Sequence, residues 1–150
     1  MKSTRNPRTR TDVAAEVRAI YRELAARPIE RGCTQLTECC RFRLTGRTPY
    51  LTKAEAVVVA KAWRATGRKG LPEIVDGSCP MLEPTTGRCR IYDSRPFGCR
   101  THFCAPAGGP YARREVADLI HRLEDLSREV GGRDALPLPA AVAAALRDDL

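Results

Sequence analysis

Cysteine is the residue that most constrains what this chain can fold into. All seven cysteines lie between residues 33 and 104, and they are Cys33, Cys39, Cys40, Cys79, Cys89, Cys99 and Cys104. An odd number does not fit a complete disulfide framework. So many thiols in so short a segment would also be an unusual way to fill a core. The pattern therefore predicts a metal ion or a metal cluster held by thiolates.

The composition is that of a globular protein of about one domain. The chain has 150 residues, of which 43% are apolar and 29% are charged. No stretch approaches the roughly 18–20 consecutive apolar residues that a membrane-spanning helix needs. The basic N-terminus has no apolar segment behind it that would mark a secretory signal. We therefore expect a cytoplasmic protein without membrane contact, in a compartment that keeps thiols reduced.

Apolar residues recur at helical spacing in the flanks of the chain, which predicts a mainly α fold with little β. The second helix has a capping box, in which Thr52 and Glu55 each satisfy an amide of the first turn. Pro28 and Gly67 stop the first and second helices. The expected helices cover about residues 12–27, 52–66, 111–130 and 139–147.

The centre of the chain has no helical period. Proline and glycine are frequent over residues 68–110, which indicates loops, broken only by the short stretch Cys89–Tyr92. Alternation over Arg41–Leu44 predicts a short strand. We expect three to four helices around an irregular, cysteine-rich metal-binding centre, because thiolate ligation contributes folding free energy to such a region. The expected division is a disordered basic tail at 1–10 and a single domain at 11–150, with the metal-binding core at 31–106 and the C-terminal helices at 111–147.

The spacing of the cysteines bears on the type of metal. None of them forms the C-x2–4-C pair that is usual in structural zinc sites. A cubane iron–sulfur cluster is larger than one ion and accepts thiolates from well-separated loops. The side chains of the neighbours Cys39 and Cys40 diverge, so they can face two different sites. The seven thiols then divide as four plus three, with the second site completed by His102, a solvent molecule or a substrate, and an open position there would indicate catalysis.

Two segments resemble a known family. Cys79-Pro80-Met81-Leu82, followed by the stretch from Cys89 to Arg100, is similar to the C-P-x-L … C-x-I-Y-x-x-R-P-x-x-C-R pattern of the YkgJ-type cysteine-cluster family. The family's N-terminal signature, C-x2-C-x2-C-C, aligns with Cys33, Cys39 and Cys40, and Leu36 stands at its second cysteine position. The resemblance covers about residues 33–104.

This resemblance implies a metal-binding module that chelates zinc or iron or contains an iron–sulfur cluster. The seven cysteines are the candidate ligands, with His102 as a further one. Leu36 changes an eight-thiol pattern to seven, so either His102 replaces the missing thiol or the usual ligand set of the family is changed here. One relative, a flagellin lysine N-methylase, carries a similar cysteine motif and an iron–sulfur cluster, so the resemblance also allows a protein-modifying role.

Several other residues have a functional and a purely structural interpretation. Arg95 and Arg100 either donate to cluster sulfurs or thiolates and offset their negative charge, or bind an anionic substrate, or are solvated arginines. Ile91 and Tyr92 are expected in the core. Trp63 is expected to pack rather than to stack on a base, and His121 is expected on an exposed face.

The leading hypothesis is a cytoplasmic protein that holds an iron–sulfur cluster, with [4Fe–4S] as the first choice, or zinc. An open metal position would give it redox or group-transfer chemistry on a protein or small-molecule substrate. The alternative is a structural zinc module whose basic surface binds nucleic acid or a protein partner, since the net charge is +8. The motifs of P-loop, Rossmann, zincin and serine-hydrolase enzymes are absent from the sequence.

Overall fold

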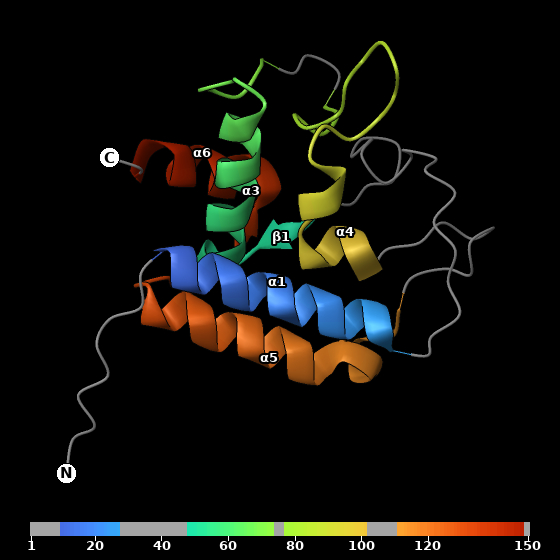
Figure 1. Cartoon of the computed structure of the whole chain (residues 1–150), viewed down its shortest axis with the longest axis vertical. Coiled ribbons are helices and arrows are strands. Elements are labelled where there is room, and N and C mark those ends of the chain that lie inside the picture. The colour runs from blue at the N-terminus through green and yellow to red at the C-terminus, as the bar shows by residue number, and fades with distance from the viewer. Residues whose placement is uncertain (1–9, 28–47, 74–76, 102–110, 149–150) are drawn as a thin grey trace.

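The computed structural model describes residues 10–27, 48–73, 77–101 and 111–148 (Figure 1). These ranges form a mainly α fold with little β, as the sequence predicts. The elements, in chain order, are helix α1 (Arg10–Ala26), strand β1 (Tyr50–Leu51), helix α3 (Lys53–Ala65), the 3-10 turn η2 (Tyr92–Ser94), helix α4 (Phe97–Thr101), helix α5 (Arg113–Glu129), strand β2 (Leu136–Pro137) and helix α6 (Leu138–Asp148).

Helices α1 and α5 lie side by side and antiparallel (Figure 1). Each presents an apolar stripe at helical spacing, and the two stripes meet in one buried cluster. Ala54 and Val58 of α3 and Phe97 of α4 join the same cluster. The stripe residues are Val13, Val17, Ile20 and Leu24 of α1 with Val116, Leu119, Leu123 and Leu126 of α5.

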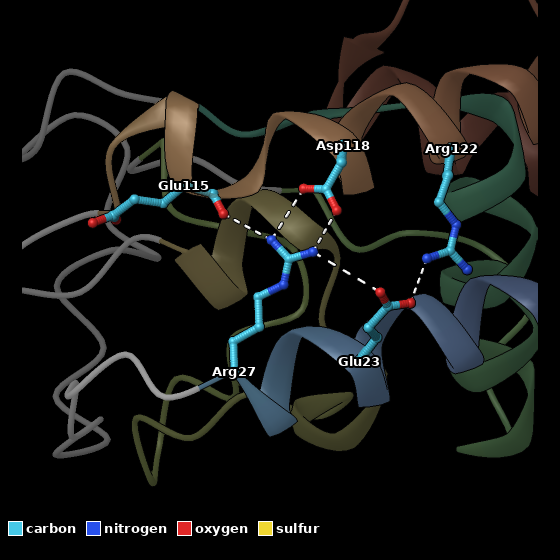
Figure 2. Close-up of polar contacts among 5 residues, drawn as sticks. All are labelled: Glu23, Arg27, Glu115, Asp118 and Arg122. Carbon is cyan, nitrogen blue, oxygen red and sulfur yellow. Dashed lines mark hydrogen bonds and ion pairs between the residues drawn. The ribbon is translucent and has the colours of Figure 1, made fainter.

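Polar side chains at the rim set the register of this helix pair (Figure 2). The Arg27 guanidinium donates through Nη1 to Asp118 Oδ1 at 3.0 Å and to the Glu115 carbonyl at 2.7 Å. Its Nη2 pairs with Asp118 Oδ2. One turn along, Arg122 pairs with Glu23, which also faces Arg27 at 3.9 Å. The two-point Arg27–Asp118 contact is the geometry in which a guanidinium and a carboxylate fit best.

Helix α3 crosses this pair and carries a second apolar cluster on its other side (Figure 1). Trp63 lies at its centre with no exposed surface, and its indole Nε1 donates to the Gly70 carbonyl at 3.0 Å. Helix α6 packs along α3. The other buried members are Leu51, Ala56, Val59, Cys79, Met81, Ile91, Leu138, Ala141 and Val142.

A two-stranded antiparallel ladder joins the start of α3 to the start of α6. Tyr50 pairs with Pro137 and Leu51 with Leu136, and the Leu138 amide donates to the Pro49 carbonyl at 2.8 Å. This ladder was not predicted, because two residues are too few to form an alternating pattern. It fixes where the chain enters α3.

The four long helices confirm the prediction from periodicity. Trp63 and Ile91 are buried and His121 is exposed, as expected, whereas Tyr92 is only half-buried. The prediction of loops over 68–110 was wrong where η2 and α4 form. The predicted strand at 41–44 and the predicted tail at 1–10, apart from Arg10 in α1, lie outside the described residues. Within the described ranges, no helix combines the length and apolar character that crossing a bilayer requires.

Gly132 provides a test of the packing between α5 and α3. Its amide donates to the Ser127 carbonyl at 2.8 Å, and Ser127 Oγ accepts from the Lys53 amide at 3.0 Å. A Cβ at position 132 would collide with Ser127 Oγ and lie 2.8 Å from Lys53 Cβ. We therefore expect Gly132→Ala to lower the free energy of unfolding by about 1–3 kcal/mol, as overpacking does, when measured by urea titration.

Gly70→Ala is the matched control, because a Cβ there meets nothing within 4 Å. It should leave stability unchanged or slightly raised. Equal stability of the two variants would show that the α5–α3 contact is looser than described.

Candidate metal centre

Glu55 is a buried carboxylate that connects three parts of the fold. Its side chain is on α3, and the residue is only 3% exposed. Glu55 Oε2 accepts from the Tyr21 hydroxyl of α1 at 2.7 Å and from the Phe97 amide of α4 at 2.7 Å. Thr52 Oγ1 accepts from the Glu55 amide at 3.3 Å, which confirms the predicted N-cap of this helix. The sequence predicted Glu55 as a capping residue only, and not as a group that joins other helices.

Burial controls the electrostatics of this group. Desolvation raises the pKa of Glu55, although hydrogen bonds from Phe97, Tyr21 and Thr52 oppose the shift. Desolvation, followed by the nearby Glu55 carboxylate, raises the pKa of Tyr21 well above its ordinary value. The pair is therefore held together by a strong hydrogen bond in an environment that disfavours charge.

The contact with Phe97 positions Cys99. Phe97 is buried in the α1–α5 cluster and opens α4, so Glu55 caps one of the free amides of that short helix. At the next position, a Cβ in place of Gly98 would lie 3.3 Å from Pro49 Cβ, so glycine allows α4 to approach the chain before β1 closely. Cys99 follows on α4 and is half-buried.

A turn and an isolated β-bridge connect the backbone of Cys79 with that of Cys89. The Leu82 amide donates to the Cys79 carbonyl at 3.0 Å, and Leu82 forms an antiparallel bridge with Cys89. Next to the bridge, the Arg90 amide donates to the Met81 carbonyl at 2.8 Å. Cys79 is a buried member of the Trp63 cluster, and Cys89 packs against that cluster. Both cysteines therefore pack in the apolar cluster that contains Trp63 of α3.

The loop between them is held by Glu83. Its carboxylate accepts from the amides of Thr85 and Thr86, and these contacts, with Thr86 the strongest, lower the pKa of Glu83 to about 2. The same carboxylate faces Arg90 Nη2 at 3.6 Å. Arg90 Nε, however, is buried and has no hydrogen-bond partner among the described residues.

Arg95 and Arg100 surround the η2 turn together with Arg18, which the sequence analysis did not single out. Arg100 donates from Nε to the Arg95 carbonyl at 2.6 Å and from Nη2 to the Asp93 carbonyl at 2.8 Å. Burial is the main cause that lowers the pKa of Arg100, and the positive charges of Arg95 and Arg18 lower it further. Tyr21 and the neighbouring Cys99 act in the opposite direction and raise this pKa. Cys99 therefore lies in a positively charged environment, of the kind that favours a thiolate.

The structure describes three of the eight predicted ligands. Cys79, Cys89 and Cys99 form no disulfide. The other candidates, namely Cys33, Cys39, Cys40, His102 and Cys104, lie outside the described residues. Among the described residues, no three His, Cys, Asp or Glu side chains gather into a group able to hold a metal ion. The described residues alone therefore do not form a site with three such ligands.

The chemistry of the described cysteines agrees with that of ligands in a thiolate-bound metal site. Cys79 and Cys89 share one neighbourhood, and sulfur ligands suit zinc and iron–sulfur clusters. Arg90 follows Cys89 in the chain, and its buried Nε lacks an acceptor among the described residues, although a buried donor of this kind calls for one. A ligating thiolate is an acceptor of the right charge.

Comparison with known families agrees with this chemistry. Residues 32–120 match the CxxCxxCC family, described as "Putative zinc- or iron-chelating domain". The match spans more than half of the chain, so the chain belongs to this family. No curated protein and no solved structure matches it. The resemblance seen in the sequence is confirmed, and membership indicates a domain that binds zinc or iron.

Glu55 makes stability depend on pH in a defined direction. Because the folded pKa is raised above the unfolded value, the folded chain holds the Glu55 proton more tightly. The contribution of Glu55 is therefore fully present below the unfolded pKa, and it is lost as pH rises through the folded pKa. We expect the free energy of unfolding of the wild type, relative to Glu55→Gln, to fall as pH rises from about 4.3 toward neutrality.

Urea unfolding at a series of pH values, on reduced protein of constant metal content, measures this difference. Glu73→Gln changes the net charge equally at an exposed position and serves as the control. A wild-type advantage that grows with pH would contradict the direction of the shift.

Proposed function

We propose that the chain binds a metal cofactor through thiolates drawn from its seven cysteines. An iron–sulfur cluster of the [4Fe–4S] type is the first choice, and zinc is the alternative. The observation that carries the proposal is that Cys79 and Cys89 both pack in the Trp63 cluster and are linked by the turn and the Leu82–Cys89 bridge. Arg90, the next residue in the chain, has a buried Nε without an acceptor among the described residues. Family membership supports the same chemistry.

The positions of the thiols favour a cluster over a single ion. Cys79 and Cys89 lie by the Trp63 cluster of α3, whereas Cys99 is on α4, next to the α1–α5 cluster. Thiols that are held by two different apolar clusters suit an iron–sulfur cluster, because such a cluster accepts ligands from well-separated loops. The candidates Cys33, Cys39, Cys40, Cys104 and His102 would supply the remaining ligands. When bound, a cluster supplies electron transfer or, at an open iron, a Lewis-acid site.

The described residues would prepare this site in three ways. Glu55 holds α4 and with it Cys99. Arg90, the residue after Cys89, has a buried N–H donor without an acceptor among the described residues. Arg100 places positive charge beside Cys99, and this charge offsets that of the thiolates. The expected activity is redox or group transfer on a protein or small-molecule substrate, in the cytoplasm, where thiols stay reduced.

Measurement of the iron, zinc and acid-labile sulfide content of the anaerobically purified full-length protein tests the proposal. We expect iron and sulfide in equal amounts, with a broad absorption band near ~400 nm. The variants Cys79→Ser, Cys89→Ser and Cys99→Ser should each lose most of the metal, because a hydroxyl is a poor replacement for a thiolate. Zinc without sulfide would select the alternative cofactor and keep the thiolate site.

His121→Gln is the control, since His121 is exposed on α5 and has no place in the proposed site. It should retain the metal content and spectrum of the wild type. If all three cysteine variants also retained them, these thiols would not be ligands and the proposal would fail. Far-ultraviolet circular dichroism of each variant separates loss of metal from loss of fold.

A further inference from the structure

Three arginines from two parts of the fold converge on one turn of the chain. Arg18 of α1 donates from Nη2 to Ser94 Oγ at 3.3 Å. Arg95 donates from Nε to the Tyr92 carbonyl at 2.9 Å. Arg100 of α4 donates to the carbonyls of Asp93 and Arg95. The segment from Tyr92 to Arg95 is thus held by three guanidinium groups, all of them half-buried.

Aromatic rings fix the planes of two of these groups. The Arg95 guanidinium carbon lies 3.9 Å from the centre of the Tyr92 ring, and that of Arg100 lies 4.2 Å from the centre of the Tyr21 ring. Tyr21 is in turn held by Glu55. Stacking occupies the face of a guanidinium and leaves its N–H edge available. These arginines are therefore held in place before any ligand arrives.

Their positive charge is not matched by carboxylates. In the part of the chain that the structure describes, none of the three forms an ion pair. The turn has one acidic side chain, that of Asp93, and it is exposed. Each guanidinium has five N–H donors, and the contacts above use one in Arg18, one in Arg95 and two in Arg100. Most of the donors therefore have no protein acceptor among the described residues.

We propose that Arg18, Arg95 and Arg100 form a binding site for an oxyanion, namely phosphate or a phosphate monoester. Three cations and planar N–H edges suit a dianion with several oxygens better than a carboxylate. Partial burial strengthens the attraction, because water screens the charges less. The site lies beside Cys99, so a bound phosphate ester would be held next to the proposed metal centre. The proposal does not require the metal, because the three arginines are positioned by protein contacts alone.

Phosphate titration of the full-length protein at low ionic strength tests this site. The readout is the arginine Nε–H resonances in proton–nitrogen NMR spectra, with chloride at equal ionic strength as the blank. We expect saturable shifts of the Arg18, Arg95 and Arg100 signals and an affinity at least ten-fold weaker in Arg18→Gln. Arg18→Lys should recover part of the affinity because it restores the charge without the fork.

Arg18 is the residue to change because it makes one hydrogen bond to the turn, so its loss disturbs the fold least. Arg128→Gln on α5, an exposed arginine paired with Asp125, alters the net charge equally and should leave the affinity unchanged. The absence of saturable shifts would overturn the proposal. An equal loss of affinity in Arg128→Gln would also overturn it, since the binding would then be non-specific.

Two comparisons define the ligand. Phenyl phosphate binding more tightly than inorganic phosphate would assign the site to an ester of a larger molecule, and equal affinity would assign it to free phosphate; both support the proposal. Acetate binding as tightly as phosphate would overturn it. Titrations with and without metal should agree. Binding seen only after metal removal would mean that the arginines serve the charge of the metal centre, which contradicts the proposal.

Discussion

The hydrogen bonds of the buried Glu55 carboxylate are the interaction on which the arrangement of this structure depends. One carboxylate oxygen ties α1 through Tyr21 and α4 through Phe97, while its backbone belongs to the first turn of α3. Removing a partner would leave a polar group buried without compensation, which costs far more than an exposed hydrogen bond contributes. The position of α4, and therefore of Cys99, follows from this contact.

The cysteine-bearing segment is held by the protein from both sides. The Trp63 cluster holds Cys79 and Cys89 through apolar packing and a single bridge. The α1–α5 cluster holds Cys99 through Phe97, two residues earlier. Between them, the η2 turn is held by arginines whose planes rest on tyrosine rings. Positive charge thus lies close to Cys99, and such an environment stabilises a thiolate.

The sequence predicted what depends on local spacing and missed what depends on distant partners. The stripes of α1 and α5 repeat at 3.6 residues, so their helices and buried faces could be read directly. Helix α4 could not, because it follows a proline and includes a glycine, and its first amide is capped by Glu55 from 42 residues away. Arg18 looked like any exposed helix residue. Tyr21, an apolar-stripe residue with a hydroxyl, was the one signal that a buried partner existed.

X-ray absorption fine structure at the metal edge of the anaerobically purified protein would show whether thiolates of this chain bind a metal. Because we propose thiolate ligation, we expect the nearest shell of atoms around the metal to be dominated by sulfur, at about 2.3 Å if the metal is zinc. A first shell made only of nitrogen and oxygen, at about 2.0–2.2 Å, would contradict it.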